Sequence, residues 1–170
     1  QACHYCNFHF TTSLRYKNEL FTSLLKEIGL QKDYLQSGPV ETIYFGGGTP
    51  SLGTIEEIHS IILKIQSCFT VSQNAEITLE ANPDDITEDK LSGWKEAGIN
   101  RLSIGIQSFF EEDLQWMNRA HNAQQAIANL QLAKEYFDNI TIDLIYGTPA
   151  LTNEKWKKNI ETAISLNIPH

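Results

Sequence analysis

Four short apolar segments, each followed by a helical pattern, restrict the fold of this 170-residue chain more than any other feature. Short apolar runs bounded by glycine or proline are typical of strands, whereas apolar residues at three- and four-residue steps are typical of helices. The expected strands cover residues 40–45, 75–81, 101–107 and 139–146. The expected helices cover residues 13–28, 54–65, 87–97, 111–137 and 153–166, and the pattern is broken within 111–137.

Repeated strand–helix units predict a parallel sheet joined by right-handed crossovers. The strands read as apolar runs covered on both faces. Two α/β architectures fit, an open doubly wound sheet and an incomplete (β/α) barrel. We expect Gly29 to stop the first helix, and Thr54 with Glu57 to form a capping box. We interpret residues 1–170 as one domain and as a piece of a longer protein, because the pattern is cut at both ends.

Composition excludes several functional classes. The net charge of -8 argues against a nucleic-acid partner, which needs a basic face. No apolar run approaches the roughly 18 residues of a membrane span. Three cysteines do not form a secreted disulfide framework, so we expect a reducing cytoplasm.

The chain opens with a cysteine pair, Cys3 and Cys6, that encloses Tyr5. A C-x-x-C pair can be a redox dithiol, half of a zinc site or part of an iron–sulfur site, and the pair alone does not choose among them. A structural zinc site needs about four ligands, and the sequence shows no second C-x-x-C or histidine pair. We expect Cys68 to be a small buried hydrophobe.

Polar residues recur where the expected strands end. The first strand runs into Gly46-Gly47-Gly48, and Glu80, Gln107 and Asp143 lie near the ends of the other three. Carboxyl ends of parallel strands meet at one edge of a sheet, so these groups should converge on a pocket. The glycine run lacks the Gly-Lys-Ser/Thr ending of a phosphate loop. Consecutive glycines instead let a ligand approach bare backbone.

Five motifs in order complete this pattern: Cys-His-Tyr-Cys (3–6), Gly-Gly-Gly-Thr-Pro-Ser (46–51), Leu-Glu-Ala-Asn-Pro (79–83), Arg-Leu-Ser-Ile-Gly-Ile-Gln-Ser-Phe (101–109) and Ile-Asp-Leu-Ile-Tyr-Gly-Thr-Pro (142–149). The set resembles radical S-adenosylmethionine (SAM) proteins, and more narrowly the oxygen-independent coproporphyrinogen III oxidase group. The resemblance implies a (β/α) barrel of six units. This chain would supply a partial barrel, from the first cluster loop to the fifth helix, without the N-terminal strand and the C-terminal part.

The resemblance also implies the cofactors, a [4Fe–4S] cluster and SAM. Cys3 and Cys6 match the second and third ligands of C-x-x-x-C-x-x-C, and the first would lie four residues before Cys3. The implied SAM contacts are Tyr5 near the adenine, Gly47, Gly48 and Thr49 at the methionine end, Glu80 and Gln107 on the nucleoside or methionyl part, Arg119 on the carboxylate, and Asp143 on the ribose.

Within this group two functions compete. The oxidase carries a further cysteine two residues after the third cluster ligand, where this chain has Phe8. That difference favours the haem-chaperone branch. The partners expected for this branch are haem and a haem-accepting protein. The alternative is the oxidase, which decarboxylates a porphyrinogen. Another radical SAM enzyme, such as a methyltransferase, ranks third. A zinc or dithiol redox module is a hypothesis from a different class. We expect His4, His9 and His121 to be surface or hydrogen-bonding residues, and Trp94, Trp116 and Trp156 to pack within helices.

Overall fold

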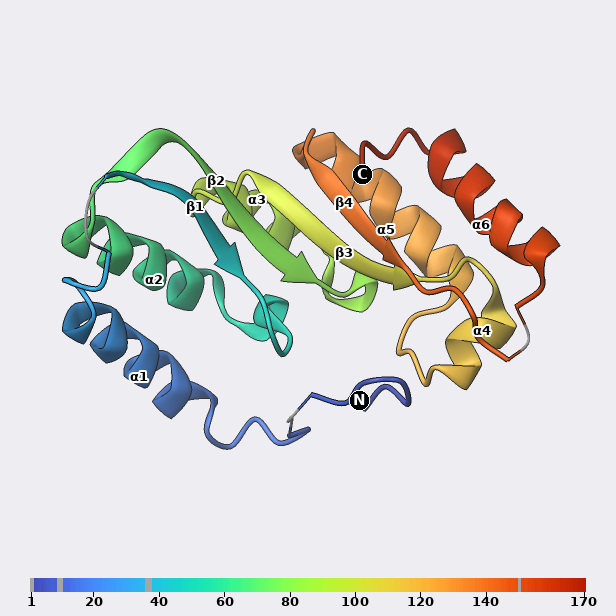
Figure 1. Cartoon of the computed structure of the whole chain (residues 1–170), viewed down its shortest axis with the longest axis horizontal. Coiled ribbons are helices and arrows are strands. Elements are labelled where there is room, and N and C mark those ends of the chain that lie inside the picture. The colour runs from blue at the N-terminus through green and yellow to red at the C-terminus, as the bar shows by residue number, and fades with distance from the viewer. Residues whose placement is uncertain (1, 9–10, 36–37, 150) are drawn as a thin grey trace.

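The computed structural model describes residues 2–8, 11–35, 38–149 and 151–170, so His9 lies outside the described residues. Four parallel strands form one sheet in the order β1-β2-β3-β4, which confirms the predicted α/β fold (Figure 1). The strands are β1 (Val40–Phe45), β2 (Val71–Ala81), β3 (Arg101–Gln107) and β4 (Ile140–Leu144). The helices are α1 (Lys17–Leu30), α2 (Ile55–Cys68), α3 (Glu88–Glu96), α4 (Glu111–Trp116), α5 (Ala123–Tyr136) and α6 (Asn153–Ser165), with short 3-10 turns η1 (Pro50–Leu52) and η2 (Pro83–Asp85).

The two faces of the sheet differ in polarity. One face carries apolar side chains that pack with those of α2, α3 and α5 into a single core. Members of this core include Ile43, Leu79, Ile104, Ile58, Trp94 and Leu130. Residues at the alternate positions point to the other face. They include Tyr44, Glu80, Arg101, Thr141 and Asp143. The expectation of strands that are apolar on both faces was therefore wrong, because an alternating polar series is interleaved with the apolar one.

Local predictions were met unevenly. The bounds of β1 and β3 are those expected, β2 begins before residue 75, and β4 ends before Tyr146. Thr54 and Glu57 form the predicted capping box, and the broken helical region is the pair α4 and α5. Helix α1 begins later than expected and continues through Gly29. A Cβ at Gly29 would lie 3.3 Å from Cε and Nζ at the flexible end of the Lys64 side chain, so Gly29 lies where α1 approaches α2 and does not end the helix.

Several burial predictions also need correction. Cys68 is only half-buried. Trp94 is fully buried as expected, but Trp116 is 45% exposed. On α6 the apolar residues Ile160 and Ile164 are 40% and 68% exposed, and the buried residue is Asn159. In the described part of the chain, no helix is long and apolar enough to cross a membrane.

Candidate functional site

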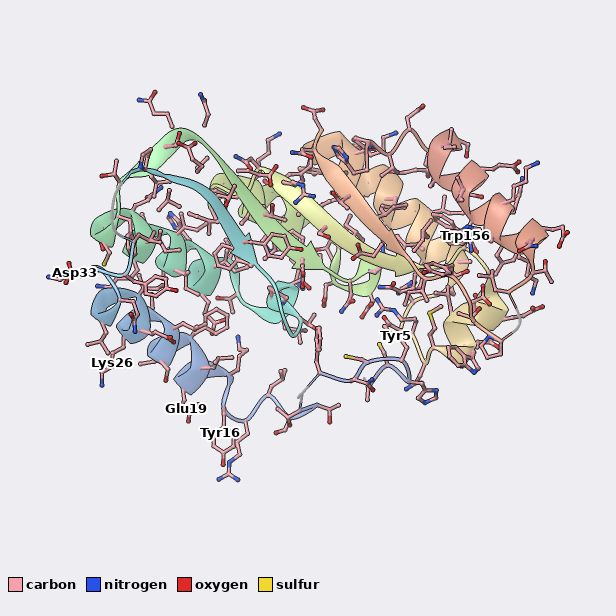
Figure 2. All side chains as sticks on the ribbon, in the orientation of Figure 1. Tyr5, Tyr16, Glu19, Lys26, Asp33 and Trp156 are labelled. Carbon is pink, nitrogen blue, oxygen red and sulfur yellow. The ribbon has the colours of Figure 1, made fainter. Side chains whose placement is uncertain are left out.

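The predicted site residues meet at the carboxyl edge of the sheet. Glu80 and Asp143 lie on the polar face near the ends of β2 and β4, and Gln107 ends β3. The N-terminal segment with Cys3 and Cys6 passes beneath this edge (Figure 1), and Figure 2 labels Tyr5 within it. Parallel strand topology brings the strand ends to one edge, and the N-terminal segment lies beside them although it is not part of the sheet.

Arg119, in the connection between α4 and α5, joins the N-terminal segment to the sheet. Its Nη1 donates to Cys3 Sγ at 3.3 Å and to the Tyr5 hydroxyl at 3.1 Å. Its Nη2 donates to Asn82 Oδ1 at 2.8 Å and to the Gly105 carbonyl at 2.9 Å. Burial raises the pKa of Tyr5 to about 12, although the Arg119 charge opposes the shift, so the phenol stays protonated at neutral pH.

Backbone contacts fix the N-terminal segment against the end of α4. The Asn118 side chain donates to the Ala2 carbonyl at 2.7 Å, and the His4 backbone N–H donates to the Met117 carbonyl at 3.1 Å. His4 Nδ1 also lies 2.9 Å from the Trp116 carbonyl oxygen, which confirms its predicted hydrogen-bonding role. The Cys6 N–H donates to the Cys3 carbonyl at 3.2 Å. The two cysteines therefore belong to one tight turn that is held in place from outside.

Glu80 links the glycine loop to β2. Its Oε1 accepts from the Tyr44 hydroxyl at 2.8 Å, and its Oε2 accepts from the Gly47 N–H at 3.1 Å. Burial and the hydrogen bond to Glu80 raise the pKa of Tyr44. Gly47 has φ 108°, a value that side-chain-bearing residues rarely adopt, so glycine is required there. No atom of the described residues lies within 4 Å of an added Cβ at Gly47 or Gly48, which leaves their backbone open to a ligand.

Gln107 occupies a strained position at the end of β3. Its φ is 68°, uncommon for a residue other than glycine, and it is 8% exposed. Its carbonyl accepts from the Ile145 N–H at 2.9 Å, which ties the ends of β3 and β4 together. A Cβ at Gly105 would lie 2.7 Å from Gln107 Nε2, so this glycine makes room for the amide. Strain of this kind is frequent at ligand-binding sites.

Asp143 is the acidic group on β4. Burial raises the pKa of its carboxyl, and the nearby Glu80 charge adds to the shift, while Arg101 opposes it. Arg101 itself is engaged deeper on the polar face, where it donates to Thr78 and Thr141. Two carboxylates that repel each other form a rim suited to hydroxyl or ammonium donors of a ligand.

Sequence reasoning missed the residues that support this site. Asn82 accepts from Arg119; it lies within the 79–83 motif, but no contact was expected for it. Buried Asp113 accepts from Ser108 Oγ at 2.8 Å and from Thr148 Oγ1 at 2.9 Å, which joins the loops that follow β3 and β4. Ser108 and Thr148 lie 5 and 35 residues from Asp113 in the sequence, so no local pattern reveals both contacts.

His121 is buried beside the same region. Its Nε2 lies 3.2 Å from the Ile106 carbonyl oxygen, and its Nδ1 lies 3.8 Å from Asp84 Oδ1. His121 holds the pKa of Asp84 below its ordinary value, although burial acts in the opposite direction. This contact brings η2 close to the segment that carries Arg119.

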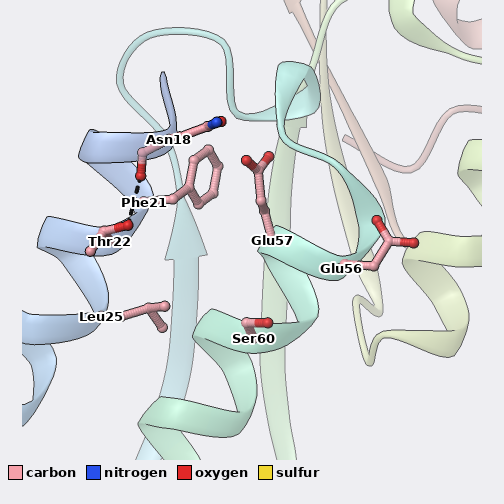
Figure 3. A pocket seen from close by; sticks show the side chains of 7 residues that line it. All are labelled: Asn18, Phe21, Thr22, Leu25, Glu56, Glu57 and Ser60. Carbon is pink, nitrogen blue, oxygen red and sulfur yellow. Dashed lines mark hydrogen bonds between the residues drawn. The ribbon is translucent and has the colours of Figure 1, made fainter. Parts of the chain in front are cut away.

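A hollow of about 280 Å³ lies elsewhere, between α1 and α2 (Figure 3). Phe21 and Leu25 supply its apolar wall, and Glu57 on its rim is paired with Lys17 at 2.6 Å. Its lining contains none of the residues predicted for the site.

The thiols of Cys3 and Cys6 are free and half-buried. Among the described residues no group of three or more histidine, cysteine or acidic side chains is placed to hold a metal ion. Two free cysteine thiols on one turn can supply two thiolates of a larger ligand set. A soft iron–sulfur cluster is the group for which such thiolates are suited.

Comparison with known proteins decides the family. A family profile described as "Radical SAM superfamily" matches residues 1–163 of the chain. The chain belongs to the radical SAM superfamily. Membership implies a [4Fe–4S] cluster and SAM as cofactors. It also identifies the sheet as part of a TIM-like radical SAM barrel, which confirms the predicted partial barrel.

Radical SAM relatives cover the chain from end to end. It is 36% identical to the haem chaperone HemW of Haemophilus influenzae, over 100% of this chain and 46% of that protein. It is 35% identical to HemW of Bacillus subtilis, over 99% of this chain and 45% of that protein. The structure of the coproporphyrinogen III oxidase HemN from Escherichia coli matches with a TM-score of 0.87 and 29% identity, over 99% of this chain and 39% of that one. The chain thus spans less than half the length of these relatives.

Proposed function

We propose that this radical SAM chain is the core part of a HemW-type haem chaperone, which binds haem and passes it to an acceptor protein in the cytoplasm. The carrying observation is the similarity to HemW proteins of several bacteria along the whole chain, at 30–36% identity. Phe8 supports the same choice, because it stands where the oxidase branch carries a further cysteine.

Within this proposal Cys3 and Cys6 are two thiolate ligands of the cluster. When bound, the cluster supplies the electron that cleaves the sulfonium of SAM. The chain's own residues bind and orient the cofactor. The open backbone of Gly47 and Gly48, with Thr49, receives the methionine end, and Tyr5 lies beside the adenine.

The remaining roles follow from charge and position. Asp143 accepts from ribose hydroxyls, and Glu80 and Gln107 contact the nucleoside or methionyl part. Arg119 Nε, which is buried and has no hydrogen-bond partner among the described residues, is the donor left for the SAM carboxylate. Both terminal nitrogens of Arg119 already have acceptors. To bind the SAM carboxylate at two points, Arg119 therefore uses Nε together with Nη2, and Nη2 exchanges one of its present acceptors for a carboxylate oxygen.

The second candidate is the oxygen-independent coproporphyrinogen III oxidase, favoured by the structural match to HemN. One experiment separates the two. Full-length protein reconstituted anaerobically with iron and sulfide is titrated with haem, and is separately incubated with coproporphyrinogen III, SAM and dithionite. Stoichiometric haem binding without decarboxylated product supports the chaperone. Turnover to protoporphyrinogen IX would overturn it in favour of the oxidase.

A further inference from the structure

The guanidinium of Arg119 spans two parts of the molecule. Its Nη2 edge is held by Asn82 Oδ1 at 2.8 Å and the Gly105 carbonyl at 2.9 Å, both on the rigid end of the sheet. Its Nη1 edge faces the N-terminal segment, at 3.3 Å from Cys3 Sγ. The Arg119 backbone N–H donates to the Leu114 carbonyl at 2.9 Å, so the main chain is anchored as well.

The sheet, rather than the N-terminal segment, sets the direction of this guanidinium. Because the guanidinium is planar, two fixed acceptors at Nη2 leave little freedom to change the direction in which Nη1 donates. Among the described residues Asn82 is the one side-chain acceptor on the Nη2 edge, and it follows directly after β2.

Hydrogen bonds to a cluster's sulfur ligands shift its reduction potential, and so does nearby charge. Reduction adds negative charge to the cluster and its thiolates. A guanidinium that donates to a thiolate sulfur therefore stabilises the reduced state more than the oxidised state.

We propose that Arg119 raises the reduction potential of the cluster through its hydrogen bond to Cys3 Sγ, and that Asn82 is the positioning residue that aims Arg119 at this sulfur. The inference rests on the proposed function in one respect, namely that Cys3 ligates a cluster. It differs from the implied SAM-carboxylate contact, because it acts on the cluster before SAM binds.

The test is a redox titration of the reconstituted full-length protein without SAM, followed by electron paramagnetic resonance. The variants are Arg119→Met, Asn82→Leu and the double variant. Asn129→Ala is the matched control, because Asn129 donates to the Pro83 carbonyl at 2.6 Å and so supports η2 beside Asn82 without being bonded to Arg119. Circular dichroism and iron content establish that each variant folds and holds the cluster.

Arg119→Met and Asn82→Leu should each lower the midpoint. We expect at least a tenfold smaller ratio of reduced to oxidised cluster at the wild-type midpoint, which is about 59 mV for one electron. The double variant should shift no further than Arg119→Met, because Asn82 acts only through Arg119. Asn129→Ala should leave the midpoint unchanged.

The two proposals fail in different ways. A wild-type protein that takes up no iron overturns the proposed function and this inference with it. A wild-type cluster whose midpoint is the same in Arg119→Met overturns the inference alone. If Arg119→Met loses the cluster, Asn82→Leu decides: an unchanged midpoint, or a shift equalled by Asn129→Ala, overturns the positioning role.

Discussion

The backbone N–H of Gly47 donates a hydrogen bond of 3.1 Å to Glu80 Oε2. This contact fastens the glycine loop after β1 to the end of β2, and the Tyr44 hydroxyl holds the other carboxylate oxygen at 2.8 Å. One acidic side chain therefore holds both the end of β1 and the glycine loop that follows it, at the edge where we propose that SAM binds.

Glu80→Ala should weaken SAM binding, because both hydrogen bonds and the proposed ligand contact disappear. The lost ligand contact, as one hydrogen bond to a charged group, is worth about 1.5–3 kcal/mol, so we expect roughly a 10- to 150-fold higher Kd. Equilibrium dialysis with the reconstituted protein measures this. Tyr44→Phe, which removes only one bond from Glu80, is the control and should have a smaller effect. Equal SAM affinity in Glu80→Ala and wild type would rule out the assigned role.

Gly47→Ala and Gly48→Ala should behave differently in stability. Gly47 has φ 108°, so a side chain there is strained by about 1–3 kcal/mol, whereas Gly48 has neither a positive φ nor a neighbour within 4 Å of an added Cβ. In urea unfolding, the free energy of unfolding should fall clearly for Gly47→Ala and hardly change for Gly48→Ala. SAM affinity should fall in both, since each methyl group covers backbone that the ligand approaches. Similar stabilities for the two variants would contradict the observed loop geometry.

Asp143→Asn should separate stability from binding. Because burial raises the pKa of the Asp143 carboxyl, its charged form is disfavoured in the folded state, and the cost is present at neutral pH. The variant should be as stable as wild type or more stable at pH 7, by up to about 0.5 kcal/mol. It should bind SAM more weakly, since an amide is a poorer acceptor for ribose hydroxyls. Thermal unfolding at pH 7 and pH 4 provides the check, because the difference should shrink at the lower pH. A variant clearly less stable at pH 7 would contradict this account.

The Asp84–His121 pair should contribute an acid-sensitive part of the stability. The pKa of Asp84 is lowered from 3.8 by His121, so the stabilisation is complete above about pH 4 and is lost as the pH falls through the folded-state pKa. Asp84→Asn removes this contribution. The difference in unfolding free energy between wild type and Asp84→Asn should therefore be largest near pH 5–7 and vanish toward pH 2. A constant difference across this range would show that the pair does not act through ionisation.

The sequence predicted the parts of this molecule that depend on local pattern. The bounds of β1 and β3 and the Thr54 capping box follow from nearby residues alone. Gly29 was misread as a stop because glycine often ends a helix with a positive φ, whereas Gly29 has no positive φ and α1 continues to Leu30. Polar residues within β2 and β3 alternate with the apolar ones, and a reading that weighed only the apolar run missed this second face.

In the site, too, some features follow from the sequence pattern and others depend on tertiary contacts. The order of the motifs along the chain is sufficient to place the cysteines, the glycine loop and the acidic residues at one edge of the sheet. The contact of Arg119 with Asn82, 37 residues away, and with Cys3, 116 residues away, depends on how the loops fold over that edge. Tertiary contacts of this length leave no periodic signal, so the supporting roles of Asn82 and Asp113 could not be predicted from the sequence.

The most direct test of the account is electron paramagnetic resonance of the reconstituted, dithionite-reduced full-length protein, recorded with and without SAM. We predict a [4Fe–4S] signal that changes when SAM is added and that is lost in Cys3→Ser and in Cys6→Ser. A protein that binds zinc or no metal, or a cluster signal that survives both cysteine substitutions and does not respond to SAM, would contradict the assignment of this site.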